Sequence, residues 1–580
     1  MMYRQHRQEQ QCHTKIAKTI PLAIVVLISI CITSSLGTDE VSSNIKTSTE
    51  NINNNRPLPH IIFILADDLG WNDVGFHGSA QIPTPNIDAL AYSGLILNQY
   101  YVNPICTPSR SALMTGKYPI HTGMQHTVLY GGEARGLPLT EKLLPEYLNQ
   151  FGYSSHIAGK WHLGHYKKIY TPMYRGFKSH VGYWTGHHDY YDHTAVENPS
   201  WGLDIRRGLD VAYDLHGKYT TDIITEEAIR VIKNHHDEQT ANRTMGPLFL
   251  YVAHAAVHSG NPYNPLPAPD SIVSKMNHID DFNRRKYAAM LSKLDESVGT
   301  IVNQLHRNNM LQDSLIVFST DNGGPAAGFN LNAASNWPLR GVKNTLWEGG
   351  VRGAGMLWYP HLKHKARVAE QRMQITDWLP TLLGSFGVSV ENSTKIDGFN
   401  IWDSLSENNL SPRTSILHNI DEIWEMGSIT IGDFKVIKGA SPYQGKWDGW
   451  YGPSGRNYEY NVTEVMNSLS GIAIKELGIM PNESEIIDLR KEATLTCRFE
   501  NKKNACNSIK EPCLYNIKND PCELNNLAKD FPDILRDLLD KMENINKTAL
   551  PPGNKPIDPR ADPRYWSNTW TDFGDFISSY

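Results

Sequence analysis

The chain has 580 residues, of which 20% are charged and 40% hydrophobic, and its formal net charge is −6. This composition excludes a disordered chain, and the length exceeds what one core accommodates, so we expect one large and one smaller domain. The acidic balance, without a run of like charges, excludes a basic nucleic-acid surface.

The first 37 residues have the pattern of a signal peptide. Basic residues precede an apolar run from Ile20 to Thr33, and small residues follow it. The run is shorter than the roughly 18 residues of a spanning helix, so we expect no stable membrane anchor, with a retained anchor as the alternative. Residues 38–56 are polar and aperiodic, which predicts a flexible segment.

Six N-glycosylation sequons support passage through a glycosylating compartment. Together with the signal peptide, they predict a protein of the secretory pathway, lysosomal or secreted. The sequons begin at Asn242, Asn392, Asn409, Asn461, Asn482 and Asn546.

Four apolar runs, each ending in polar residues, predict strands of a large sheet. They span residues 61–65, 153–158, 248–253 and 315–319. Between them, residues 140–151, 221–234 and 284–307 carry apolar side chains every three or four positions, as helices do. The repetition of strand, polar tip and helix predicts an α/β fold that gathers its ligands at one edge of the sheet.

Three carboxylates and one amide follow two of these runs. They belong to Asp67, Asp68, Asp321 and Asn322. An Asp pair alone more often caps a helix or closes a turn, but four oxygen ligands at two strand ends suit Ca²⁺ or Mg²⁺ better than zinc. The combination predicts a divalent cation site.

Cys106 is the one cysteine for which the sequence offers no disulfide partner. Of the seven cysteines, Cys12 and Cys31 fall in the leader, and the four near the C-terminus can pair among themselves. Pro108 predicts a helix start, whose first amides and Arg110 would face an anion beside Cys106. A thiolate is too soft for a Ca²⁺ shell, which favours a modified cysteine over a buried bystander.

The C-terminal part predicts a smaller α+β domain. Alternating residues at 428–431 and 434–437 suggest an antiparallel sheet, and residues 532–546 a helix. Cys497, Cys506, Cys513 and Cys522 predict two disulfides whose pairing stays open. The expected division is 57–425 for the catalytic domain, 426–550 for the C-terminal domain and 551–580 for an extended tail.

The motif Cys106-Thr107-Pro108-Ser109-Arg110 resembles the sulfatase family, in particular its arylsulfatase B (N-acetylgalactosamine-4-sulfatase) branch. The resemblance continues at residues 159–164, 319–324, 336–341 and 346–353, and it covers about residues 57 to 425. It implies an alkaline phosphatase-like sulfatase fold, a large mixed sheet flanked by helices, and the hydrolysis of sulfate esters.

The family also implies a mechanism. Cys106 would be oxidised to formylglycine by the formylglycine-generating enzyme, and one hydroxyl of the hydrated aldehyde would attack sulfur to give a covalent sulfo-enzyme. One Ca²⁺ would be bound by the modified residue with Asp67, Asp68, Asp321 and Asn322. The implied catalytic and substrate-binding residues are Arg110, Lys160 and Lys343 on the sulfate oxygens, His258 as proton donor, and His162 as the base that deprotonates the second hydroxyl.

Several alternatives stay open. In isolation, His162 could be a core histidine and Lys343 a solvated loop lysine, and His254 competes with His258. A phosphohydrolase of the same superfamily would need Ser or Thr at position 106 and more zinc ligands. A catalytically silent glycoprotein that binds sulfated glycans would keep Cys106 unmodified. The expected substrate is N-acetylgalactosamine 4-sulfate of glycosaminoglycans, or an aryl or plant sulfate such as a glucosinolate, and the oligomeric state is left undetermined.

Overall fold

The computed structural model describes residues 57–197, 199–242, 245–390, 394–441, 445–501 and 505–576. They belong to a unit that spans Glu50–Tyr580. The predicted signal peptide and the flexible segment 38–56 lie outside the described residues. Within the described part of the chain, no helix is both long and apolar enough to cross a membrane.

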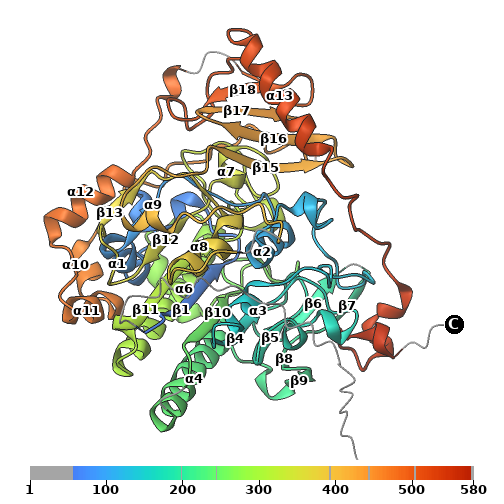
Figure 1. The fold of residues 1–580 in the computed structure, drawn as a ribbon, viewed down its shortest axis with the longest axis vertical. Helices are drawn as coiled ribbons and strands as arrows, with labels where there is room; N and C mark the ends of the chain where they lie inside the picture. The colour runs from blue at the N-terminus through green and yellow to red at the C-terminus, as the bar shows by residue number, and fades with distance from the viewer. Residues whose placement is uncertain are drawn as a thin grey trace, which may run out of the picture. The chain divides into compact units, whose positions relative to one another are not determined.

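A ten-stranded mixed sheet forms the centre of the fold (Figure 1). The middle strands β11, β1, β10, β4 and β5 are parallel to one another, and both edges contain antiparallel pairs. The predicted mixed sheet is confirmed. In sheet order the strands are β13 (Arg367–Ala369), β2 (Leu95–Leu97), β12 (Gly355–Trp358), β11 (Ser314–Thr320), β1 (His60–Ala66), β10 (Leu248–Ala253), β4 (Ser154–Lys160), β5 (Ser179–Tyr183), β8 (Arg206–Arg207) and β9 (Asp210–Val211).

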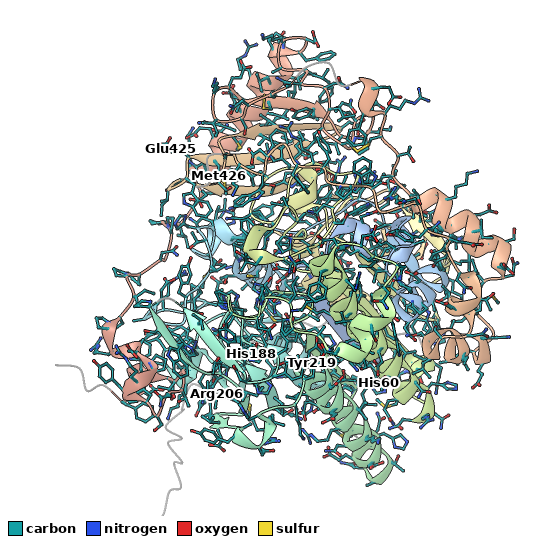
Figure 2. All side chains as sticks on the ribbon, turned by 180° about the vertical axis from the view of Figure 1, so that it is seen from behind. His60, His188, Arg206, Tyr219, Glu425 and Met426 are labelled. Atoms are coloured by element: carbon teal, nitrogen blue, oxygen red, sulfur yellow. A yellow bond between two sulfur atoms is a disulfide. The ribbon has the colours of Figure 1, made fainter. Side chains whose placement is uncertain are left out.

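Both faces of this sheet are buried by helices, as the uniformly apolar strands require. Alternate residues of β1 serve the two faces: Ile62 and Ile64 pack in the core with α1, α4 and α6, and Ile61 and Phe63 pack in the core with α2, α3 and α8. Side chains fill the space between these layers (Figure 2). The helices are α1 (Pro85–Ser93), α4 (Thr220–Ala241), α6 (Phe282–Arg307), α2 (Cys106–Thr115), α3 (Leu144–Asn149) and α8 (Trp378–Gly384).

Shorter elements complete the layers. Helices α10, α11 and α12 lie beside α1. The small elements are α5 (Asp270–Val273), α7 (Glu348–Val351), α9 (Trp402–Ser406), α10 (Val462–Met466), α11 (Leu469–Glu476) and α12 (Glu483–Ala493), and the two-stranded pairs β3 (Tyr100–Tyr101) with β14 (Met373–Gln374) and β6 (Thr194–Glu197) with β7 (Ser200–Leu203).

The predicted C-terminal antiparallel sheet is confirmed and has four strands. They are β15 (Ser415–Asp421), β16 (Met426–Ile431), β17 (Phe434–Lys438) and β18 (Cys513–Asn516). Helix α13 (Pro532–Asn546) packs on this sheet through Leu538 and Met542, and its bounds are those predicted. Because β15 pairs with β16, the sheet begins before residue 426, and the predicted domain boundaries stay predictions.

Two disulfides resolve the pairing that the sequence left open. Cys497 bonds Cys522, and Cys506 bonds Cys513. Cys106 is the free cysteine of the described residues, and it is buried. The pairing arithmetic that set Cys106 apart is therefore confirmed for the described cysteines.

Candidate functional site

The ends of β1 and β11 bring the predicted cation ligands together. These neighbouring parallel strands are in register, with Ala66 opposite Thr320, so the residues that follow each strand emerge at the same edge. Asn322 donates from Nδ2 to Oδ1 of Asp68 over 2.7 Å, and the backbone N–H of Asp68 donates to Oδ1 of Asp321 over 3.3 Å. Asp67, Asp68, Asp321 and Asn322 are all fully buried.

Three cationic side chains neutralise the three carboxylates. Lys160 Nζ lies 2.6 Å from Asp67, and Lys343 Nζ lies 2.7 Å from Asp68. Arg110 Nη2 lies 3.0 Å from Asp321, and its Nη1 donates to the Lys160 carbonyl over 3.3 Å. A buried charge without a partner strongly destabilises the folded protein. Each of these carboxylates therefore depends on its cationic neighbour, and each cationic side chain on its carboxylate.

The pKa values of Asp67 and Asp321 reflect the short distances between these buried charges. Burial alone would raise the pKa of Asp67, but the Lys160 ammonium and the other nearby cations hold it well below the usual range. For Asp321, burial and the charge of Asp67 raise the pKa. A divalent cation would relieve this repulsion between carboxylates.

The donor set fits a hard divalent cation. Among the residues that the structure describes, Asp67 Oδ1 and Asn322 Oδ1 are buried oxygens without a hydrogen-bond partner. Ligand atoms of Asp67, Asp68 and His258 lie within 4.8 Å of one another. Carboxylate and amide oxygens are the ligands of Ca²⁺ and Mg²⁺.

Cys106 is the first residue of α2 and lines a cavity of about 1000 Å³. The same cavity is lined by His162, His258 and Lys343, whereas Arg110 and Lys160 lie behind it, against the carboxylates. Burial raises the pKa of the Cys106 thiol, although Lys160 and Lys343 oppose the effect. An unmodified Cys106 is therefore a neutral thiol at pH 7 and a weak nucleophile.

His162 is held as a neutral imidazole. Its Nε2 lies 3.0 Å from the Leu129 carbonyl, which only accepts, so Nε2 carries the proton and Nδ1 keeps its lone pair. Burial and the nearby Lys160 and Arg110 charges hold its pKa well below the usual value. Its φ of 60° is unusual for a residue other than glycine, which is typical of functional sites.

His258, and not His254, lies beside the carboxylates. His258 Nδ1 is 2.6 Å from the Ser259 carbonyl, and Nε2 is 3.5 Å from Asp68 Oδ2. His254 Nε2 instead lies 3.1 Å from the hydroxyl of Ser297 on α6, away from the cavity. His258, which the sequence ranks above His254, is the one of the two that lies in the cavity, and its catalytic role stays a prediction.

His187, in the stretch 187–191 that the sequence predicts to border the pocket, lines the cavity and stacks on His258 with ring centroids 5.9 Å apart. Other residues of the cavity were not predicted from sequence. Glu197, at the end of β6, accepts a hydrogen bond from the Gly131 N–H, yet burial raises its pKa to about 7. Residues of the C-terminal tail, among them Arg564, also line the cavity. An isolated Glu gives no signal in the sequence, whereas the repeated Asp-Pro-Arg of the tail is a pattern that sequence inspection could have found.

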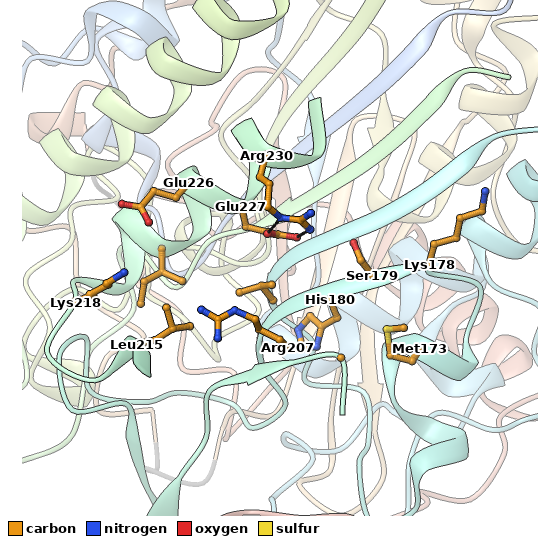
Figure 3. A pocket seen from close by; sticks show the side chains of 13 residues that line it. Met173, Lys178, Ser179, His180, Arg207, Leu215, Lys218, Glu226, Glu227 and Arg230 are labelled. Atoms are coloured by element: carbon orange, nitrogen blue, oxygen red, sulfur yellow. Dashed lines mark hydrogen bonds and ion pairs between the residues drawn. The ribbon is translucent and has the colours of Figure 1, made fainter. Parts of the chain in front are cut away.

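A second cavity of about 450 Å³ contains none of the predicted site residues. Charged side chains surround it, including Lys178, Lys218 and Arg207, and Arg230 pairs with Glu227 at its margin (Figure 3). These charges are largely solvated or paired with one another, which is the ordinary state of a charged surface.

The predicted glycosylation sites lie at the surface where the structure describes them. Asn242, Asn409, Asn461 and Asn482 are exposed, and Asn546 is half-buried. Asn392 lies outside the described residues. Asn461 and Asn482 cap the first turns of α10 and α12 through their side-chain oxygens.

Comparison with known proteins identifies the family of this chain. The protein family described as Sulfatase matches residues 59–388. Mouse arylsulfatase J is 39% identical over 516 residues, which cover 88% of this chain and 80% of the relative. Human N-acetylgalactosamine-6-sulfatase is 31% identical over 399 residues, covering 65% of this chain and 71% of the relative.

A solved structure shows the same fold. The crystal structure of Ps i-CgsB in complex with k-i-k-neocarrahexaose is 26% identical, with a TM-score of 0.65, and covers 90% of this chain and all of that one. These relatives support the sulfatase family rather than the arylsulfatase B branch in particular.

Proposed function

The chain belongs to the sulfatase family and is a sulfuric ester hydrolase, and we propose that it acts through a formylglycine derived from Cys106. The observation that carries the proposal is the position of Cys106 in the cavity, at the start of α2 and together with Lys343, His162 and His258. The neutral thiol is a weak nucleophile, so the chemistry needs the residue in another form.

We further propose that Asp67, Asp68, Asp321 and Asn322 hold one Ca²⁺, with residue 106 completing the shell. The unpartnered oxygens of Asp67 and Asn322 support this assignment. Three carboxylates and three cationic side chains balance, so a bound divalent cation leaves an excess of positive charge for a sulfate ester. The ion would polarise the sulfate oxygens.

The chain's own residues then have distinct tasks. Lys343, which lines the cavity, and Lys160 and Arg110 behind it stabilise the sulfate oxygens by their charge. His258 gives a proton to the alcohol oxygen as its bond to sulfur breaks; burial lowers its pKa, and the nearby Asp68 carboxylate opposes that effect. His162 takes a proton at Nδ1 in the second step. The hydrated aldehyde would supply one hydroxyl as nucleophile and a second that would allow sulfate to leave by elimination.

The proposed substrate is an N-acetylgalactosamine sulfate of a glycosaminoglycan. Two observations support a sulfated glycan: the name of the N-acetylgalactosamine-6-sulfatase relative and a cavity at the upper end of the roughly 300–1,000 Å³ of small-molecule sites. An aryl sulfate is the second candidate, because the arylsulfatase J relative is named for such substrates. We propose a secretory-pathway location, lysosomal or secreted, because the predicted signal peptide and the exposed sequons agree with each other.

Mass spectrometry of the peptide that contains residue 106, combined with activity, tests the proposal. Protein produced in a eukaryotic secretory host should carry formylglycine at residue 106 and hydrolyse p-nitrophenyl sulfate and N-acetylgalactosamine 4-sulfate. Cys106→Ala, with no thiol to oxidise, should fold and be inactive. Finding only unmodified cysteine, with sulfated glycan bound but not hydrolysed, would instead establish the silent binding protein.

A further inference from the structure

One wall of the cavity that Cys106 lines comes from the far end of the chain. The lining includes Ile557, Asp558, Asp562, Arg564 and Tyr565, more than 400 residues beyond Cys106. We call residues 553–574 the C-terminal strap. Figure 1 shows this segment running from the end of α13 to the region of β6 and β7.

The strap is fixed at both ends by backbone hydrogen bonds. On one side, Gly553 donates to the Gly123 carbonyl and Asp558 to the Gly132 carbonyl, each over 2.8 Å. On the other side, Trp570 donates from its backbone to the Leu203 carbonyl over 3.0 Å and is buried. The middle of the strap therefore has a defined position against the cavity.

This middle part contains the same turn twice. Asp558-Pro559-Arg560 and Asp562-Pro563-Arg564 each form a short helical turn, in which the Asp carboxylate accepts from the backbone N–H of the Arg at 3.0 Å. Each Asp also pairs with the guanidinium of its own Arg, at 2.6 Å and 2.7 Å. In the second turn the Arg564 side chain lines the cavity, whereas in the first turn Asp558 and Pro559 line it and Arg560 does not.

The pairing orients Arg564 without using all of its donors. Nε and Nη2 of Arg564 donate hydrogen bonds to the Asp562 carboxylate, whereas Nη1 of Arg564 makes no hydrogen bond to any described residue. The side chain is 77% exposed, so an anion can reach it. Tyr565 next to it is 70% exposed and offers an aromatic face.

We propose that Arg564 and Tyr565 are specificity-determining residues that bind the sugar next to the one that loses sulfate. The guanidinium of Arg564 binds an anionic group of that neighbouring sugar, either a uronate carboxylate or a second sulfate, and Tyr565 packs on the sugar ring. The enzyme then prefers acidic oligosaccharides to a lone sulfated sugar. This inference rests on the proposed sulfatase function and names the substrate class of the same site.

Kinetics on matched substrates test this assignment. The substrates are p-nitrophenyl sulfate, the sulfated monosaccharide, and three disaccharides in which the neighbour is neutral, a uronate, or neutral with a second sulfate. Arg564→Ala should raise KM about fivefold for an acidic disaccharide and leave the other substrates unchanged, because an exposed charge-assisted contact is modest. The acidic disaccharide whose KM rises in Arg564→Ala shows whether Arg564 binds a carboxylate or a sulfate.

Arg560→Ala is the matched control, because Arg560 occupies the twin turn but its own side chain does not line the cavity. It should change no KM, and both variants should keep the thermal unfolding midpoint of the wild type. Arg564→Lys should restore part of the preference, and Tyr565→Ala should raise KM for all three disaccharides. The inference is wrong if Arg564→Ala affects monosaccharide and disaccharides alike or not at all while the wild type hydrolyses p-nitrophenyl sulfate. A wild type that hydrolyses none of these esters would overturn the proposed function as well.

Discussion

Lys343 Nζ lies 2.7 Å and 2.8 Å from the two carboxylate oxygens of Asp68, and both side chains are almost completely buried. Burial alone would lower the pKa of Lys343, but the Asp68 carboxylate raises it, so the lysine stays charged. The lysine both neutralises a proposed cation ligand and borders the cavity beside Cys106. A single side chain thus links the stability of the site to its proposed affinity for sulfate.

Replacing Lys343 by Ala should destabilise the protein, because it leaves Asp68 buried without its cationic partner. We expect the free energy of unfolding to fall by about 3 kcal/mol in the presence of a chelator, as measured by denaturant titration. Added Ca²⁺ should recover part of the loss by binding near Asp68. Lys363→Ala removes an exposed pair with Glu407 and should change stability little. Equal effects of the two substitutions would contradict the buried-pair argument.

The proposed cation site predicts a metal-dependent stability. Chelation should lower the unfolding midpoint of the wild type and abolish sulfatase activity, and Ca²⁺ should restore both, because a ligand that binds the folded state stabilises it. Asp321→Asn should remove the Ca²⁺-dependent shift in calorimetry. The matched control is Asp540→Asn on the exposed face of α13, which should retain it. A Ca²⁺ response that survives in Asp321→Asn would place the ion elsewhere.

The parts of the site that could be predicted from sequence are the residues that directly follow a predicted strand. Asp67 and Asp321 follow apolar runs that become adjacent parallel strands, and the register of such strands brings their ends together. The free cysteine followed from pairing arithmetic, and the helix at Cys106 from Pro108. These features depend on local pattern, which the sequence carries directly.

The remaining parts depend on contacts between segments far apart in the chain. Nothing near Glu197 indicates that it will accept a hydrogen bond from Gly131 and line the cavity. The pairing of Cys497 with Cys522 required the fold, because four cysteines allow three arrangements. The tail could be predicted as extended, but its place beside Cys106 could not, since backbone hydrogen bonds to distant carbonyls set it.

Glu197 predicts a pH-dependent affinity for the substrate. Burial raises its pKa to about 7, so the side chain is neutral below that pH and negatively charged above it. Because it lines the cavity, the charged form should repel a sulfate ester, and KM should rise as the pH increases through 7. Glu197→Gln should flatten this rise in a KM profile from pH 5 to 9, a range that spans roughly two units on either side of the transition.

Glu226→Gln is the control for that profile, because Glu226 lines the separate second cavity. It should keep the wild-type dependence of KM on pH. If the Glu197 variant also keeps it, the rise has another origin and the charge of Glu197 does not reach the substrate.

A substitution at Gly186 tests how precisely the His162 ring must be positioned for activity. A Cβ added at Gly186 would lie 2.7 Å from His162 Nε2, closer than real Cβ atoms approach, so Gly186→Ala must shift the ring or the backbone. The shift would break the hydrogen bond between Nε2 and the Leu129 carbonyl that fixes the tautomer. We expect kcat to fall roughly 100-fold, the effect of misplacing a catalytic group by about 1 Å.

Gly449→Ala is the matched control, since a Cβ there meets open space. Its kcat should equal that of the wild type. The Ca²⁺-dependent rise in unfolding midpoint should persist in Gly186→Ala, because the three atoms nearest to the added Cβ all belong to His162 and not to a proposed cation ligand. If that rise were lost together with kcat, the substitution would have disturbed the whole site, and the specific positioning of His162 would lose its support.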